Sequence, residues 1–300
     1  AAVLHVEKAR RAGCLVVPEA RVVRLIEGAE GRIAALEFRR PDGVLHKVRA
    51  RIFVLAANAL ETPRLLMHSG LCRNSRALGR FLMDHLLVHC SFRAPEPVYA
   101  GRGPQTTSLV DYGRDGAFRR RYAAAKIFLS NALDVQGEAV RLLANPAQWP
   151  VLKEKLREYA KFHAMFGAEI EVLPDPDNRL MLVADERDAF GMPKLRARFQ
   201  PGDYSERGVR HWLDQMQSWV EAMGGKIKGT RVQMSSHHPA GTCRMGTKPE
   251  DSVVTRDLRC HEHPNLYIVG SAVFPTIGTA NPTLTIAALA LRLAEKLARE

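Results

Sequence analysis

The alternation of apolar and polar positions divides the 300-residue chain into three blocks. The first block, residues 1–85, opens with a helical stretch. Three strand-like runs follow, separated by turn signals at Glu27-Gly28 and Pro41-Asp42-Gly43: residues 14–23, 32–39 and 44–54. The pattern then predicts a helix whose first turn is marked by Thr62-Pro63.

The second block, residues 86–235, has longer polar loops and a different character. It is predicted to contain a charged helix, a strand-rich region and an amphipathic helix closed by two glycines, near 151–161, at 169–183 and at 205–223 respectively.

The third block, residues 236–300, mixes loops with short strands. Residues 266–269 form a continuous apolar run, as a buried parallel strand would, and Gly270-Ser271 end it. A helix from Pro282 to about Ala298 closes the chain. No apolar stretch approaches the roughly 18 residues of a membrane-spanning helix, so none is predicted.

The net charge of +12 raises the question of nucleic-acid binding. The distribution of the charge argues against it. Residues 119–121 form a tight basic run, whereas acidic and basic side chains interleave elsewhere. A solvated basic face is the expected result, and no nucleic-acid partner is predicted.

The five cysteines are widely spaced and odd in number, which does not suit a disulfide framework. Zinc is the other use to weigh, because cysteine and histidine side chains gather in this part of the chain: Cys243, Cys260, His261, His263 and the paired His237-His238. Their spacing fits no compact ligand pattern, so no metal site is predicted. The cysteines leave the cellular compartment open.

Two segments place a polar side chain directly before a proline, at His238-Pro239 and Asn281-Pro282. A residue before proline is held out of the helical region, so both side chains stand on stiff, extended backbone. Asn is also a favoured N-cap and Pro a favoured first helical residue, so Asn281 is predicted to cap the terminal helix.

These residue types suit the oxidation of an alcohol. A histidine with an ordinary pKa near 6.5 takes a hydroxyl proton at neutral pH, which makes His238 the candidate base. The Asn281 amide would donate a hydrogen bond to the substrate oxygen. Each feature alone also has a plainer interpretation, a loop histidine and a helix cap, and His237 is an alternative that lacks the proline restraint.

Taken together, the segments resemble the glucose–methanol–choline (GMC) family of flavin oxidoreductases. His238-Pro239-Ala240-Gly241-Thr242-Cys243-Arg244-Met245-Gly246 is similar to the catalytic-histidine motif of that family, and residues 265–276 and 281–283 resemble its C-terminal flavin-contacting segments. Upstream, residues 56–71 resemble a second signature, and residues 79–85 resemble the flavin-adjacent stretch that follows it.

The resemblance implies an α/β FAD-binding domain interrupted by an α+β substrate domain with an antiparallel sheet. Residues 1–85 and 236–300 would form the first domain and residues 86–235 the second. The family pattern implies that FAD is contacted by several residues of this chain: Val22, Asn58, Gly270, Ser271, Asn281, Pro282 and Thr283.

The sequence departs from the family pattern at several points. Gly270 replaces a common acidic residue, and Asn58 and Cys72 stand where small residues are expected. These changes resemble the gluconate, fructose and sorbitol dehydrogenase large subunits, which implies a cytochrome or quinone as electron acceptor. No Gly-x-Gly-x-x-Gly follows an early strand, so we expect the chain to begin inside an incomplete flavin domain and to bind FAD poorly alone.

The sequence therefore predicts an FAD-dependent oxidoreductase for the CH–OH group of an alcohol, polyol or sugar. In this hypothesis His238 acts as the base and Asn281 binds the substrate oxygen. The alternative is a non-catalytic fragment or a partner-binding remnant of such an enzyme.

Overall fold

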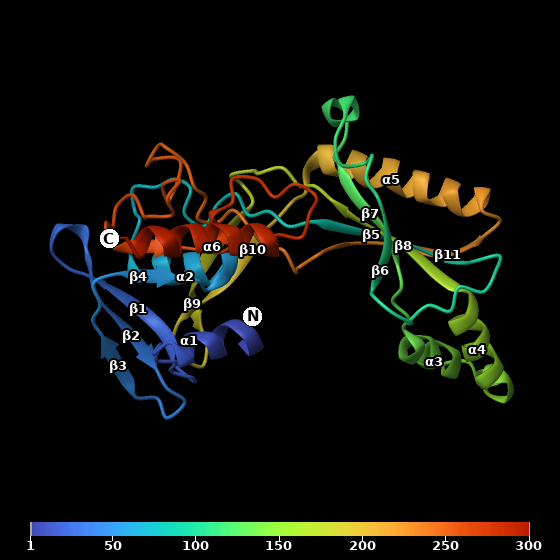
Figure 1. The fold of residues 1–300 in the computed structure, drawn as a ribbon, viewed down its shortest axis with the longest axis horizontal. Helices are drawn as coiled ribbons and strands as arrows, with labels where there is room; N and C mark the ends of the chain where they lie inside the picture. Colours follow the sequence, from blue (N-terminus) through green and yellow to red (C-terminus); the bar gives the residue numbers. More distant parts are fainter. Residues whose placement is uncertain (1, 300) are drawn as a thin grey trace.

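The computed structural model describes residues 2–299, which form two lobes with separate hydrophobic cores. The lobes lie side by side along the long axis of the molecule (Figure 1). The mixed lobe is built from the first and last parts of the chain, around residues 21–83 and 240–297. The sheet lobe is built from the middle part, around residues 86–172 and 199–227.

The mixed lobe begins with a short helical stretch, η1 (Ala2–Val6) and α1 (Glu7–Arg11), as the sequence predicts. An antiparallel meander then runs through β1 (Arg21–Glu27), β2 (Ile33–Arg39) and β3 (Leu45–Val48). The predicted strand at 14–23 was placed too early: Glu19 has a left-handed backbone (φ 54°) just before β1, and the side chains from Cys14 to Glu19 are exposed. Because the side chains of this segment are exposed, pairing it with a neighbouring strand would bury no apolar surface.

The predicted strand at 44–54 is in fact two strands in different sheets. β3 pairs with β2, whereas β4 (Phe53–Leu55) pairs in parallel with β12 (Leu266–Ile268). The exposed residues Arg49–Arg51 separate them. All three residues of β12 are buried, which confirms the prediction of a buried parallel strand.

Helix α2 (Asn58–Ser69) starts four residues before the predicted first turn, so Pro63 lies inside it. Proline has no N–H, so the carbonyl of Ala59, four residues earlier, lacks its helical donor. The buried Thr242 hydroxyl donates to that carbonyl at 2.6 Å. Pro63 thereby fixes part of the 238–246 segment against α2.

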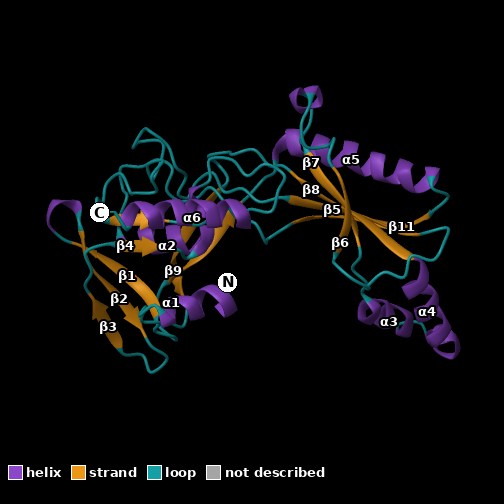
Figure 2. Cartoon of the chain, in the orientation of Figure 1, coloured by secondary structure: helices purple, strands orange, loops and turns teal. Residues whose placement is uncertain are grey.

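The sheet lobe contains a five-stranded antiparallel sheet in the order β11-β5-β8-β7-β6, which confirms the expected antiparallel sheet. Its strands are β5 (Leu86–Arg93), β6 (Thr106–Val110), β7 (Ala125–Ser130), β8 (His163–Ile170) and β11 (Lys226–Met234). Helix α5 (Gly202–Ala222) runs along this sheet (Figure 2). It packs on the sheet through Trp212, Met216 and Val220, which are four residues apart and buried.

Two further helices of the sheet lobe are α3 (Val135–Leu143) and α4 (Leu152–Phe162). The sequence predicted α4 but not α3. Asp134 caps α3 by accepting the Gly137 N–H, and Leu142 is its buried residue. One buried residue in nine gives little apolar periodicity to recognise.

A hairpin within the middle part of the chain returns to the mixed lobe. β9 (Arg179–Arg187) and β10 (Pro193–Arg198) pair with each other, and Arg64 of α2 holds the connecting turn. Its guanidinium pairs with Asp188 at 2.7 Å and donates to the Pro193 carbonyl at 2.7 Å. The chain therefore crosses between the lobes more often than the three sequence blocks suggest.

The C-terminal helix α6 (Thr283–Leu297) packs on the mixed lobe through Ile286, Leu289, Leu293 and Leu297. Leu284 and Leu291 on it are 82% and 65% exposed. Within residues 2–299, no helix is both long and apolar enough to span a bilayer.

Asn265 joins the meander to the parallel strands of the mixed lobe. Its buried amide accepts the Ile33 N–H at 2.8 Å and donates to the carbonyls of Ile33 and Arg51 at 2.9 and 3.2 Å. A leucine of similar size would leave these backbone groups without a partner.

We predict that Asn265→Leu lowers the free energy of unfolding by about 3 kcal/mol, the cost of stranding buried polar groups. Urea denaturation followed by circular dichroism measures the change. Asn74→Leu is the matched control, because Asn74 is exposed and bonds Glu262 at the surface. Equal stabilities for the two variants would contradict this role of Asn265.

Candidate active site

The segment 238–246 is fixed on both sides by backbone pairing. On one side, Met83 and Ala240 exchange two N–H···O bonds of 3.0 and 2.9 Å. On the other, the N–H groups of Cys243 and Met245 donate to the carbonyls of Ala272 and Val273, both at 2.8 Å. His238 therefore stands at the start of a segment with little freedom to move.

Gly241 shows how closely these segments approach. Its φ of +90° is unfavourable for an L side chain, and a Cβ atom there would lie 2.2 Å from the Phe81 carbonyl oxygen. Glycine is therefore required at this position of the motif by packing alone.

Asp84 aligns two histidines. One of its carboxyl oxygens accepts the backbone N–H of His85 at 2.8 Å and that of His238 at 3.3 Å. Burial raises the pKa of Asp84, and these two N–H donors oppose the rise. From the sequence, residues 79–85 were recognised only as resembling a flavin-adjacent stretch, and neither Asp84 nor His85 was given a role.

The rings of His85 and His238 form the centre of the site. Their Nδ1 atoms are 3.0 Å apart, and the Nε2 of His85 is 3.1 Å from the Gly278 carbonyl oxygen. A carbonyl only accepts, so His85 carries its proton on Nε2. Burial lowers the pKa of His85 from 6.5 to about 4, so the ring is neutral at pH 7 and its Nδ1 is an acceptor.

The same reasoning fixes the tautomer of His238. Because His85 Nδ1 accepts, His238 must donate its Nδ1 proton to it. The Nε2 of a neutral His238 then carries the lone pair and is an acceptor. That atom lies 3.1 Å from the Asn281 amide nitrogen and accepts its N–H.

Asn281 connects His238 to the sheet lobe. Its amide nitrogen also lies 3.2 Å from Glu169 of β8, and its amide oxygen accepts from Lys126 of β7. Lys126 and Glu169 are direct partners in the strand register and form an ion pair. Both were missed from the sequence, because only the register of two strands places them side by side.

The prediction that Asn281 caps the terminal helix was wrong. The residue before α6 is Pro282, whose carbonyl accepts the Ile286 N–H at 2.9 Å, and no side chain caps this end. The Asn281 amide is directed instead toward His238, Glu169 and Lys126, which use both of its polar atoms.

The other residues expected to contact a cofactor are spread over the mixed lobe. Val22 is in β1, and Asn58, with a left-handed backbone (φ 59°), starts α2 and accepts the Leu60 N–H. Gly270 and Ser271 follow β12, and the Ser271 hydroxyl donates to the Pro239 carbonyl at 2.6 Å. Thr283 opens α6 and is exposed. Thus Ser271 meets the His238 segment directly, whereas Val22 and Asn58 lie on elements that do not carry the histidines.

Within residues 2–299, two groups of side chains bring possible metal-ligand atoms close together. These are Asp84 with His85 and His238, and Cys72 with Cys260 and His263. In the first group the two Nδ1 atoms already face each other and Asp84 accepts backbone N–H groups, so the polar atoms have partners. The sequence prediction had not placed Cys72 beside Cys260.

A cavity of about 710 Å³ in the sheet lobe lies elsewhere. It is bounded by β5, β11, α3 and α4 and contains none of the residues of the histidine site. The cavity and the histidine site are therefore separate places in the molecule.

The neutral state of buried His85 predicts a pH-dependent stability. Its folded pKa of about 4 is below the unfolded value of 6.5, so the unfolded chain binds more protons in between. This contribution is fully present above pH 6.5 and is lost as the pH falls toward 4, by about 3 kcal/mol. Urea unfolding at pH 7 and pH 4.5 should show a smaller acid loss for His85→Asn than for the unchanged protein. Identical losses would show that His85 is not held neutral.

Comparison with known proteins gives a consistent picture. Two family models described as GMC oxidoreductase match residues 1–87 and 174–290. The fructose dehydrogenase large subunit of Gluconobacter japonicus is 36% identical over 298 residues, covering 97% of this chain and 55% of that protein. The 2-methyl-1,2-propanediol dehydrogenase of Mycolicibacterium austroafricanum is 28% identical, covering 86% of this chain and 49% of that protein. The chain thus spans about half the length of these relatives.

Solved structures show the same fold. The chain matches pyridoxine 4-oxidase from Mesorbium loti with a TM-score of 0.68 at 22% identity, covering 94% of this chain and 57% of that one. It also matches a variant of formate oxidase from Aspergillus oryzae RIB40, studied for the modification of its FAD. That match has a TM-score of 0.66 at 16% identity and covers 93% of this chain and 60% of that one.

Proposed function

Because the chain belongs to the GMC oxidoreductase family, we propose that its parent protein is an FAD-dependent dehydrogenase of CH–OH groups. The observation that carries the proposal is the meeting of His238 Nε2 with the Asn281 amide at 3.1 Å. A basic lone pair and an N–H donor at one point suit a substrate hydroxyl, which offers a proton to the first and a lone pair to the second.

The residues present fit the ring end of FAD. A Cβ atom added at Gly270 would meet nothing within 4 Å, so the strand end is open beside the His238 segment. Asn281, Thr283 and Leu284, at and just before the start of α6, are exposed. We propose that Gly270, Ser271, Asn281, Pro282 and Thr283 hold this end, with Val22 and Asn58 farther along the cofactor. The sequence has no Gly-x-Gly-x-x-Gly, so these residues account for only part of the group.

FAD, when bound, supplies the acceptor for the hydride that leaves the alcohol carbon. His238 takes the hydroxyl proton on Nε2, since donation from its Nδ1 to neutral His85 leaves the lone pair on Nε2. The amide of Asn281 donates to the substrate oxygen as negative charge builds on it. In this view the substrate hydroxyl replaces the bond between His238 and Asn281.

Lys126 and Glu169 position the Asn281 amide. Lys126 binds its oxygen, so the nitrogen must face His238 and the substrate. We propose that the lobe made chiefly of residues 86–235 binds the rest of an alcohol, polyol or sugar. Residues 1–85 and 236–300 would then form the flavin domain. We further propose a cytochrome or a quinone as the electron acceptor, and no nucleic-acid partner.

We predict that His238→Ala in the full-length protein lowers the rate of anaerobic flavin reduction by a factor of 100 or more, because the proton loses its acceptor. Stopped-flow absorbance measures the rate, and the flavin spectrum reports bound FAD. His237→Ala is the control, since His237 is the exposed neighbour in sequence. A His238→Ala enzyme that reduces its flavin at the normal rate would remove the basis of the proposal.

Lys126→Met should lower kcat/KM about 10-fold to 100-fold without loss of FAD, because a charge-assisted bond to the Asn281 oxygen is removed. Steady-state kinetics and flavin content are the measurements. Lys228→Met removes an exposed lysine of β11 from the same lobe and should leave kcat/KM unchanged. If both variants behave alike, Lys126 does not position Asn281.

A further inference from the structure

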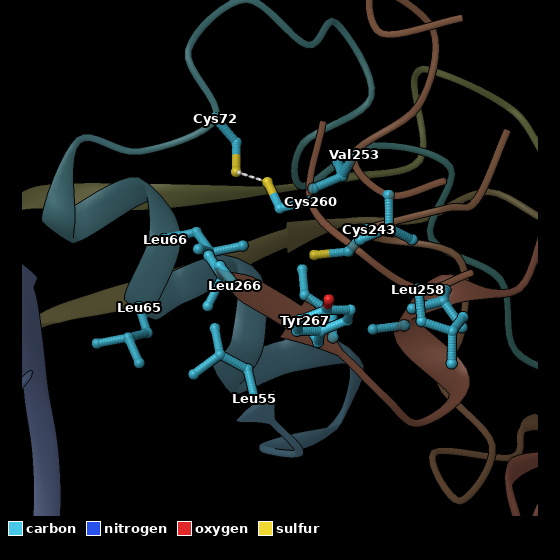
Figure 3. Packing of buried hydrophobic residues seen from close by; sticks show 14 of the residues in the cluster. Leu55, Leu65, Leu66, Cys72, Cys243, Val253, Leu258, Cys260, Leu266 and Tyr267 are labelled. Carbon is cyan, nitrogen blue, oxygen red and sulfur yellow. Dashed lines mark hydrogen bonds between the residues drawn. The ribbon is translucent and has the colours of Figure 1, made fainter. Parts of the chain in front are cut away.

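Two buried thiols meet outside the histidine site. Cys72 lies just after α2, and Cys260 lies shortly before β12, 188 positions later in the chain. Their Sγ atoms are 3.1 Å apart and face each other (Figure 3). Each residue is 1% exposed. The sulfurs are about 1 Å farther apart than the ~2.05 Å of a disulfide bond.

The backbone at Cys72 gives an independent reason to look for a role of its side chain. Its φ of +53° is left-handed, where glycine is favoured and an L side chain is strained. The resemblance to the GMC family also leads one to expect a small residue here. The backbone alone therefore does not account for a cysteine at this position.

His263 is the third member of this cluster, and both of its ring nitrogens are engaged. Its Nδ1 lies 2.7 Å from the Gly31 carbonyl oxygen and its Nε2 accepts the Cys72 N–H at 3.2 Å. A metal ion would need the Nε2 lone pair and would leave that N–H unpaired. The geometry thus favours chemistry between the two sulfurs over metal binding.

We propose that Cys72 and Cys260 form a disulfide bond when the protein is exposed to a small-molecule disulfide oxidant. The bond covalently joins the loop after α2 to the loop before β12. These loops belong to the first and last parts of the chain, which together build the mixed lobe. The crosslink therefore holds together the two halves of the lobe that carries both histidines.

With oxidised glutathione as the oxidant, the thiol–disulfide exchange takes place in two steps. The Cys260 thiolate attacks one sulfur of the oxidant, and a mixed disulfide forms as one glutathione thiolate leaves. Cys72 then gives up its proton and attacks Cys260 Sγ, which releases the second glutathione. Two protein thiols lose two electrons, and one oxidant molecule becomes two thiols that take up the two protons.

Cys260 is the better attacking group. The hydrogen bond from the Cys72 thiol, helped by the backbone N–H groups of Glu262 and His263, lowers the pKa of Cys260, and burial opposes this. The pKa of Cys72 is raised by the same thiol pairing and by burial. Because both sulfurs are buried, exchange occurs while the chain folds or when these loops open.

The full-length protein provides the test, with a readout independent of activity. It is produced in an oxidising compartment, alkylated to trap free thiols, and digested with trypsin without reductant. Cleavage after arginine releases residues 65–73, with Cys72, and residues 260–292, with Cys260. We expect mass spectrometry to find these peptides joined, with two hydrogens lost, and separated by dithiothreitol.

Stability supplies a second readout. The oxidised protein should melt roughly 3–10 °C higher than the dithiothreitol-treated protein, because the crosslink restricts the unfolded chain. This difference should vanish in Cys72→Gly, which suits the left-handed backbone, and in Cys260→Ala. Cys90→Ala, which removes a buried cysteine of β5, should keep it.

Two results would overturn the proposal. One is full alkylation of both cysteines in protein folded in the presence of oxidised glutathione. The other is one equivalent of bound zinc that depends on Cys72, Cys260 and His263, since this would make the cluster a metal site.

Discussion

The position of one proton on buried His85 determines which nitrogen of His238 carries a proton and which one accepts. The Gly278 carbonyl can only accept, so it takes the Nε2 proton of His85. Because burial keeps this ring neutral near pH 7, His85 must accept from His238 at Nδ1. His238 is thereby fixed as an Nδ1–H tautomer, and its Nε2 is left basic toward Asn281. A charged His85 would instead donate its Nδ1 proton to the Nδ1 of His238. The proton of a neutral His238 would then sit on Nε2, and that atom could no longer accept.

The site depends on both lobes at once. The mixed lobe supplies His85, His238 and Asn281, whereas the sheet lobe supplies Lys126 and Glu169 through adjacent strands. Asn281 is the point of contact, since its oxygen faces Lys126 and its nitrogen lies between Glu169 and His238. A substrate hydroxyl placed there would meet groups from both lobes. Under the proposed function, variation in the sheet lobe would change the substrate while His238 stays the proton acceptor.

Much of the fold could be predicted from sequence where one periodicity served one sheet or helix. The buried strand at 266–268, the helix α5 and the closing helix were all recognised by their apolar pattern. The run at 44–54 misled because its alternation continues across two different sheets. His238 and Asn281 were proposed from their prolines and the family motif, and the structure places them 3.1 Å apart. Lys126, Glu169 and Cys72 could not be placed, since their partners are set by strand register and by loops 188 residues apart.

The most direct test of the account is an absorbance spectrum of the full-length protein, recorded without oxygen before and after addition of polyols and sugars. The account predicts the bands of bound FAD and their bleaching by at least one CH–OH compound. A colourless protein that takes up no FAD would contradict the assignment of the site to alcohol oxidation. The same holds for a flavin that none of these compounds reduces, and a non-catalytic role would then remain for the chain.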